Sequence, residues 1–288
     1  MKKTINTKTL KNIIIQKIPL SNVSLNLNIV TNISEFKISK IINQTNNRKI
    51  LFNKNVNQNI LLKVKELNFS TLINIGNELY SFKLLKNTNF PNIVKKKKSV
   101  VCGTDKKIYE NLSSNKLILC KHGESNIPII INILEYVPGE SFYNYLEKNI
   151  VTLNILKNFI LQLFFTFYFM YEKGIDYNDD NLNNFIIQNI KFNAKYKIEG
   201  FFKEFSFDYK FILIDFDKVS FNAVTGSYLP QETYLGMIFD MNKCFYRIIS
   251  KLSAKYKYVQ GINFEKIVNK CFWEKCKSVN EFIKLIEY

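Results

Sequence analysis

The feature that most constrains the fold is FILQLFFTFYFMY, a run of 13 residues (159–171) that is apolar except for Gln162 and Thr166. It lies inside a longer helical pattern, and Gly174, a residue type that often ends helices, follows it. We therefore expect a helix from about Thr152 to Lys173. A membrane span takes about 20 apolar residues, so the run predicts a buried core helix and no membrane span.

The sequence changes in texture near residue 138. Upstream, short apolar segments alternate with Asn- and Lys-rich turns and predict strands of a twisted antiparallel sheet, interrupted by one helix at about 70–87. Pro138 and Gly139 mark a break. Downstream the pattern is mainly helical, with two short strands, FII and FILIDF, separated by a polar and aromatic insert (191–210). We expect an α+β chain with a β-rich domain at 1–137 and a mainly helical domain at 138–288.

Charge and cysteine content exclude several classes. The net charge is +17, but only Arg48 and Arg247 are arginine. Arginine is the preferred reader of phosphates and guanine edges, so we predict no specific nucleic-acid binding. The five cysteines are an odd number without CxxC spacing, and the single histidine, His122, is remote from the pair Cys271 and Cys276. We expect no zinc site, no disulfide scaffold and a soluble protein of a reducing, cytoplasmic compartment.

Candidate catalytic residues lie in GIDYNDDNLNNFII (174–187) and shortly after it. Asp179 is followed five residues later by Asn184 and then by three apolar residues. Asp215 ends the apolar run FILI, 31 residues beyond Asn184 (215 − 184). Carboxylate and amide oxygens are the hard ligands that Mg²⁺ prefers, so this arrangement predicts a magnesium and phosphate site.

These residues resemble the catalytic loop (H-R-D-x-x-x-x-N) and the D-F-G segment of the protein-kinase-like superfamily. The resemblance implies a two-lobed protein-kinase-like fold, with a β-rich N-lobe and a mainly helical C-lobe. It also implies that Asp179 is the catalytic base, that Asn184 and Asp215 hold Mg²⁺, and that ATP is the phosphate donor.

The resemblance extends along the chain in the expected order. LEYVPGESFYNYL looks like the hinge, which implies that the main chain of Glu135 to Val137 meets adenine. Lys63 in ILLKV looks like the phosphate-pairing lysine of the third strand, and Glu78 is its candidate helix partner. Asp240 resembles the acid that anchors the catalytic loop as structural support.

The sequence also departs from the family pattern. No glycine precedes Gly76, so INQTNNR (42–48) stands in place of the Gly-rich phosphate loop. Tyr177 and Asn178 replace the histidine and arginine of the loop, and Asn181 stands where many protein kinases carry a catalytic lysine. The missing lysine is similar to haspin-like kinases, kinases of large DNA viruses and small-molecule kinases. A viral protein of this kind would lie in the host cytoplasm or in a virion. The segment Ile214 to Lys218, IDFDK, is similar to lipopolysaccharide kinases.

We therefore expect an ATP- and Mg²⁺-dependent kinase, most simply a serine/threonine-protein kinase with a protein substrate. One alternative is a small-molecule or carbohydrate kinase of the aminoglycoside, choline or lipopolysaccharide type, acting on a small hydroxyl acceptor. Another is a catalytically dead pseudokinase that serves as an interaction module. The sequence makes no prediction of oligomeric state.

Overall fold

The structure of the chain is a computed structural model. It describes residues 28–29, 34–37, 40–44, 48–54, 59–68, 71–86, 88–111, 117–120, 126–198, 201–221, 243–256 and 279–287, with most side chains from Ile60 onward but not those of 117–120. The chain forms two compact units. One comprises Met1–Lys86 and Val94–Val137, and the other comprises Asn87–Ile93 and Pro138–Tyr288. Both helices and strands are present throughout, as expected for an α+β protein.

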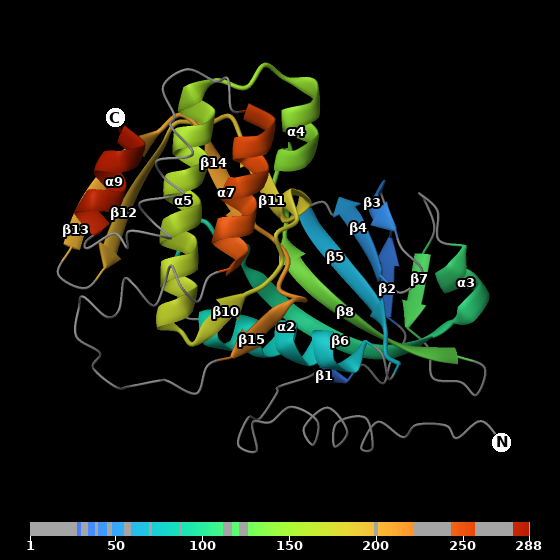
Figure 1. The fold of residues 1–288 in the computed structure, drawn as a ribbon. Helices are drawn as coiled ribbons and strands as arrows, with labels where there is room; N and C mark the ends of the chain where they lie inside the picture. Colours follow the sequence, from blue (N-terminus) through green and yellow to red (C-terminus); the bar gives the residue numbers. More distant parts are fainter. Residues whose placement is uncertain are drawn as a thin grey trace. The chain divides into compact units, whose positions relative to one another are not determined.

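The N-terminal unit is built on a six-stranded sheet in the order β1-β6-β8-β5-β4-β3 (Figure 1). All neighbouring pairs are antiparallel except β1 with β6, which is parallel. Strands β3, β4 and β5 follow one another as a meander, so β5 is its third strand. The strands are β1 (Asn28–Ile29), β3 (Lys40–Gln44), β4 (Arg48–Lys54), β5 (Asn59–Glu66), β6 (Lys96–Asp105) and β8 (Asn126–Glu135).

The two faces of this sheet differ because successive side chains on a strand alternate between faces. One face carries a purely hydrophobic cluster that includes Leu62, Val64 and Ile131. The other face is covered by helix α2 (Leu72–Leu85), whose Ile75 and Leu79 pack against Val101 and Ile130. Lys63 and Lys65 alternate with Leu62 and Val64 along β5, so both lysines lie on the face that α2 covers.

Smaller elements complete the N-terminal unit. Strands β2 (Ser34–Lys37) and β7 (Leu117–Cys120) form a separate two-stranded antiparallel sheet, and α3 (Lys106–Glu110) follows β6. The sequence predicted a strand at β7, in the segment KLILC, and a single strand, FKISKII (36–42), where the structure has the end of β2 and most of β3, and it grouped both segments with the main sheet. Cys102 is disulfide-bonded and Cys244 is a buried free thiol. The sequence analysis expected no disulfide scaffold and a reducing compartment, and so did not anticipate the disulfide at Cys102.

The C-terminal unit is organised around α5 (Leu153–Glu172), the predicted core helix (Figure 1). Thr152 caps its first turn by accepting a hydrogen bond from the Ile155 N–H at 3.4 Å, and Gly174 follows its end with φ = 71°. By length and composition α5 would be long and apolar enough to cross a membrane, but 78% of its most apolar window is buried within the chain. Burial of this kind is typical of a core helix. The described residues of this unit also form helices α4 (Phe142–Lys148), α7 (Lys243–Tyr256) and α9 (Val279–Glu287).

Three short β structures accompany these helices. The sheet order β14-β11-β9 and the pair β10-β15 bring separate parts of the chain together, and β12 and β13 form a hairpin. The sequence predicted β11 and β14 but described the hairpin only as an insert. The strands are β9 (Glu140–Ser141), β10 (Ile175–Tyr177), β11 (Phe185–Gln188), β12 (Phe192–Ile198), β13 (Phe201–Phe207), β14 (Lys210–Leu213) and β15 (Val219–Phe221).

The segment Asn87–Ile93 belongs to the C-terminal unit although it lies between α2 and β6 in sequence. Its buried Asn92 donates from Nδ2 to Gln162 Oε1 at 2.7 Å and to the Phe211 carbonyl at 2.8 Å. The Tyr196 hydroxyl donates to Asn92 Oδ1 at 2.6 Å, so this amide joins the segment to α5, β14 and the hairpin. Every polar atom of the Asn92 side chain therefore has a partner in the C-terminal unit.

Candidate functional site

A buried ion pair joins β5 to α2 in the N-terminal unit. Lys63 Nζ lies 2.6 Å from Glu78 Oε1, and the two residues are only 2% and 0% exposed. Lys65 Nζ lies 2.8 Å from the other carboxylate oxygen, Oε2. The sequence predicted the pairing of Lys63 with Glu78 but missed Lys65. One carboxylate thus holds two ammonium groups on the same face of the strand.

Polar side chains extend this pair across the sheet. Asn132 of β8, opposite Lys63 in the strand register, donates to Glu78 Oε2 at 3.0 Å. Ser99 of β6, opposite Asn132, donates to its Oδ1 at 2.6 Å, and Lys96 Nζ donates to Ser99 Oγ at 3.2 Å. Burial lowers the pKa of Lys96, partly opposed by the negative charge of Glu78. The network fixes the Glu78 carboxylate, since both of its oxygens accept hydrogen bonds.

The predicted hinge lies at the end of β8. The N–H of Glu135 donates to the Lys95 carbonyl at 2.9 Å, and its side-chain Oε1 accepts from the Lys95 N–H at 2.9 Å. Val137 is buried and is the last residue of the N-terminal unit. Because the Glu135 N–H already has an acceptor, this group is not a donor for adenine.

The predicted catalytic loop begins where β10 ends. Asp179 is buried, and its Oδ1 accepts a hydrogen bond from the Asn181 N–H at 3.3 Å and an ion pair from Lys218 Nζ at 3.3 Å. Pairing of β10 with β15 fixes this segment, because the Asn178 N–H donates to the Lys218 carbonyl at 2.9 Å. The Asp179 carboxylate is therefore held by its own loop and by the turn that precedes β15.

Asn184 ends the short 3₁₀ turn η1 (Leu182–Asn184) and is buried. Its Nδ2 donates to the Tyr177 hydroxyl at 3.0 Å, so Oδ1 is the atom left to ligate a metal ion. Burial, with the negative charges of Asp215 and Asp179, raises the pKa of Tyr177 well above its usual range. Tyr177 is therefore a neutral phenol that orients Asn184.

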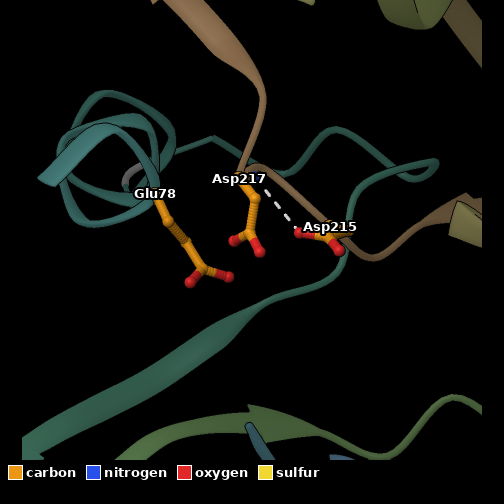
Figure 2. Close-up of side chains that lie close together, drawn as sticks. All are labelled: Glu78, Asp215 and Asp217. Atoms are coloured by element: carbon orange, nitrogen blue, oxygen red, sulfur yellow. Dashed lines mark hydrogen bonds between the residues drawn. The ribbon is translucent and has the colours of Figure 1, made fainter. Parts of the chain in front are cut away.

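Asp215 follows β14 and is buried. Its backbone neighbour Ile214 donates from N–H to the Asn184 carbonyl at 2.9 Å, which ties the segment after β14 to the end of the loop. Asp215 Oδ1 accepts from the Asp217 N–H at 3.1 Å, and Figure 2 shows this bond and the two side chains. The two carboxylates offer oxygens within 4.8 Å of each other, a spacing that suits a shared cation. Glu78, also drawn in Figure 2, belongs to the N-terminal unit described above.

Basic residues of α7 hold the outer side of the loop. Arg247 Nε lies 3.1 Å and Lys251 Nζ 3.0 Å from Asp180 Oδ2, and Arg247 also donates to the Asn178 carbonyl at 3.2 Å. Burial alone would raise the pKa of Asp180, but the hydrogen bond from Lys251 and the charges of Lys251 and Arg247 lower it overall. Asp240, predicted to anchor the loop, lies outside the described residues.

Several residues of these networks escaped the sequence analysis. Lys65 could have been predicted from the sequence, because it lies two residues from Lys63 on a strand and must lie on the same face. Asn132 could also have been predicted, since it is the one amide inside the apolar stretch IIINIL. Lys218 and Arg247 could not, because each meets the loop through contacts about 40 to 70 residues away in sequence.

Comparison with known proteins adds no assignment: no family model matches this chain, and no curated protein matches it.

Proposed function

We propose that the protein is an ATP- and Mg²⁺-dependent phosphotransferase of protein-kinase-like architecture that acts on serine or threonine hydroxyls of protein. The observation that carries the proposal is the buried ion pair between Lys63 and Glu78. Lys63 lies on the third strand of a meander and Glu78 on the helix that follows it, as in the lysine–glutamate pair that protein kinases use to hold ATP phosphates. A buried lysine held by a helix glutamate is costly to maintain for stability alone.

Asp179 is the proposed base. It would accept the proton of the acceptor hydroxyl while the acceptor oxygen forms a bond to the γ-phosphorus of ATP. The bond from that phosphorus to the β,γ-bridging oxygen breaks, and ADP leaves with the electron pair. The buried carboxylate suits this role because Asn181 and Lys218 both address Oδ1, which leaves Oδ2 as the oxygen directed to the hydroxyl.

Asn184 and Asp215 are the proposed metal ligands. Asn184 presents Oδ1 because Tyr177 takes its Nδ2, and Asp215 presents a carboxylate beside that of Asp217. These oxygen donors fit Mg²⁺, which when bound neutralises charge on the β- and γ-phosphates.

A thermal-shift titration tests nucleotide binding. Millimolar ATP with Mg²⁺ should raise the Tm by mass action, at about 2.7 kcal/mol for ligand at about 100 times Kd. Asp215→Asn should remove the Mg²⁺-dependent part of the shift, whereas Glu204→Gln, on an exposed hairpin acid, should not. No shift for the wild-type protein would favour the alternative of a pseudokinase interaction module.

A small-molecule acceptor is the second candidate. Asn181, at the position of the catalytic lysine in many protein kinases, accepts from the Asn183 N–H at 3.0 Å and so serves as a cap for η1. The IDFDK segment, similar to lipopolysaccharide kinases, leads from Asp215 into β15. Transfer of radiolabelled phosphate from ATP to casein, compared with transfer to aminoglycosides, choline and sugars, separates the two acceptor classes.

A further inference from the structure

Backbone pairing between β10 and β15 places Lys218 beside Asp179. Its carbonyl accepts the Asn178 N–H, and the next residue, Val219, pairs with Tyr177 in the β10–β15 register. This fixes the Lys218 backbone next to the loop, while the side chain remains 64% exposed and ends 3.3 Å from Asp179 Oδ1. The ammonium group therefore lies beside Asp179 at the end of an exposed side chain, on a backbone that the strand pairing fixes.

The other cations around the loop have different partners. Arg247 and Lys251 both meet Asp180, and Arg247 also binds the loop backbone. Within the part of the chain that the structure describes, the ion pair that reaches Asp179 is made by Lys218. The loop itself, residues 178–184, contains no lysine or arginine.

The ion pair between Lys218 and Asp179 also differs from an ordinary surface pair. Lys195 and Glu204 on the hairpin are a close match, at 3.4 Å with a lysine 63% exposed, but Glu204 is 52% exposed whereas the Asp179 side chain is 10% exposed. The Lys218–Asp179 pair thus joins an exposed cation to a buried acid, which the Lys195–Glu204 pair does not.

We propose that Lys218 is a catalytic residue that contacts the transferred phosphate, supplying from the segment after Asp215 the cation that the loop lacks at Asn181. This role rests on the proposed phosphotransferase function. Charge develops on the oxygens of the phosphoryl group during transfer, and an ammonium group at the base is placed to stabilise it. Lys218 would leave Asp179 for the phosphate as the acceptor proton moves to Asp179.

The test compares Lys218→Met, Lys218→Arg and Lys195→Met in transfer of radiolabelled phosphate from ATP to casein and in ATP hydrolysis without acceptor. Lys218→Met should lower kcat by about 10²- to 10³-fold, as for loss of one transition-state donor, with little change in the KM for ATP. Lys218→Arg should retain most of the rate, because it keeps the charge. The matched control Lys195→Met should behave as wild type, and all four proteins should share one Tm within a few degrees.

A relocated lysine provides the second measurement. Asn181→Lys, added to Lys218→Met, places an ammonium group two residues after Asp179 and should recover part of the lost kcat. Wild-type kcat in Lys218→Met, or an equal loss in Lys195→Met, would overturn the role of Lys218 while leaving the phosphotransferase proposal intact. Absence of transfer and hydrolysis in the wild-type protein would overturn both.

Discussion

The two polar networks of this protein are built in opposite ways. In the N-terminal unit, Lys63 and Asn132 are buried and both bind the carboxylate of Glu78 on α2. In the C-terminal unit, the acids of the loop are held by cations that remain about half exposed, among them Lys218 and Lys251. The first network is closed to water, whereas the second is open at the side of its cations.

The two networks are expected to differ in how much the loss of one charged partner lowers the free energy of unfolding. Removing one partner of a buried ion pair leaves a charge without water or counter-ion and costs about 3–5 kcal/mol. Removing an exposed cation costs little, because water replaces it. We therefore expect substitutions in the N-terminal network to lower the free energy of unfolding as well as the affinity for ATP, and substitutions in the loop to act mainly on turnover.

The largest effect is expected for Asp179→Asn. Loss of the proposed base should lower kcat by about 10²- to 10⁴-fold, measured as phosphate transfer to casein, while the ATP-induced thermal shift is retained. Asp208→Asn, on an exposed acid of the same unit, is the control. Full activity of Asp179→Asn would show that the loop takes no part in catalysis, and the proposed functional difference between the two networks would then be wrong.

Glu78→Ala should have the next largest effect, but on folding. It leaves Lys63 and Lys65 without the carboxylate they share, so the free energy of unfolding in urea should fall by about 3–5 kcal/mol. Glu110→Ala, on an exposed helix acid paired with Lys106, should change it by less than about 0.5 kcal/mol. Equal effects of the two variants would contradict the description of the N-terminal network as closed.

Tyr177→Phe should affect both the free energy of unfolding and turnover. It removes the buried acceptor of Asn184 Nδ2, which should cost about 1–3 kcal/mol of unfolding free energy and lower kcat by misorienting the proposed metal ligand. Tyr143→Phe, on an exposed ring of α4, is the control for loss of a hydroxyl. A variant that keeps both full stability and full kcat would show that Tyr177 does not orient Asn184.

The smallest effect is expected for Asp180→Asn and depends on pH. The folded-state pKa of Asp180 is lowered, so its charged form adds stability above the unfolded-state pKa, and this contribution is lost as pH falls through the folded-state pKa. The variant should be less stable than wild type by below about 1 kcal/mol near pH 6, and the gap should close as the pH falls through the folded-state pKa. Urea unfolding at several pH values measures the difference in free energy of unfolding between the two proteins. A difference that grows as the pH falls would contradict the prediction.

The sequence predicted those features that depend on local pattern. Helix α5 followed from an apolar run with Thr152 before it and Gly174 after it, and both ends lie where expected. The pairing of Lys63 with Glu78 was proposed from their order along the chain, and the structure places them 2.6 Å apart. Strand period and helix caps are short-range properties, so one sequence is enough to find them.

Features that depend on distant contacts were missed. The hairpin of β12 and β13 has alternating buried residues, Ala194 and Tyr196 on one strand and Phe205 and Phe207 on the other, but abundant Lys and Phe obscured the alternation. Lys218 is one lysine among many, and its register to Asp179 arises only when β15 pairs with β10. The contact between Lys218 and Asp179 is therefore set by the fold and leaves no local pattern.

The position of Asn87–Ile93 bears on whether this protein is modular. Because this piece is inserted in the N-terminal half of the gene product yet completes the C-terminal unit, neither unit corresponds to one continuous stretch of chain. A fragment beginning at Pro138 would lack Asn92 and would leave Gln162 and the Tyr196 hydroxyl without the amide they bind. A single cut in the chain therefore cannot yield two fragments that each contain one complete unit. Recombination between related chains must keep Asn87–Ile93 together with the rest of the C-terminal unit.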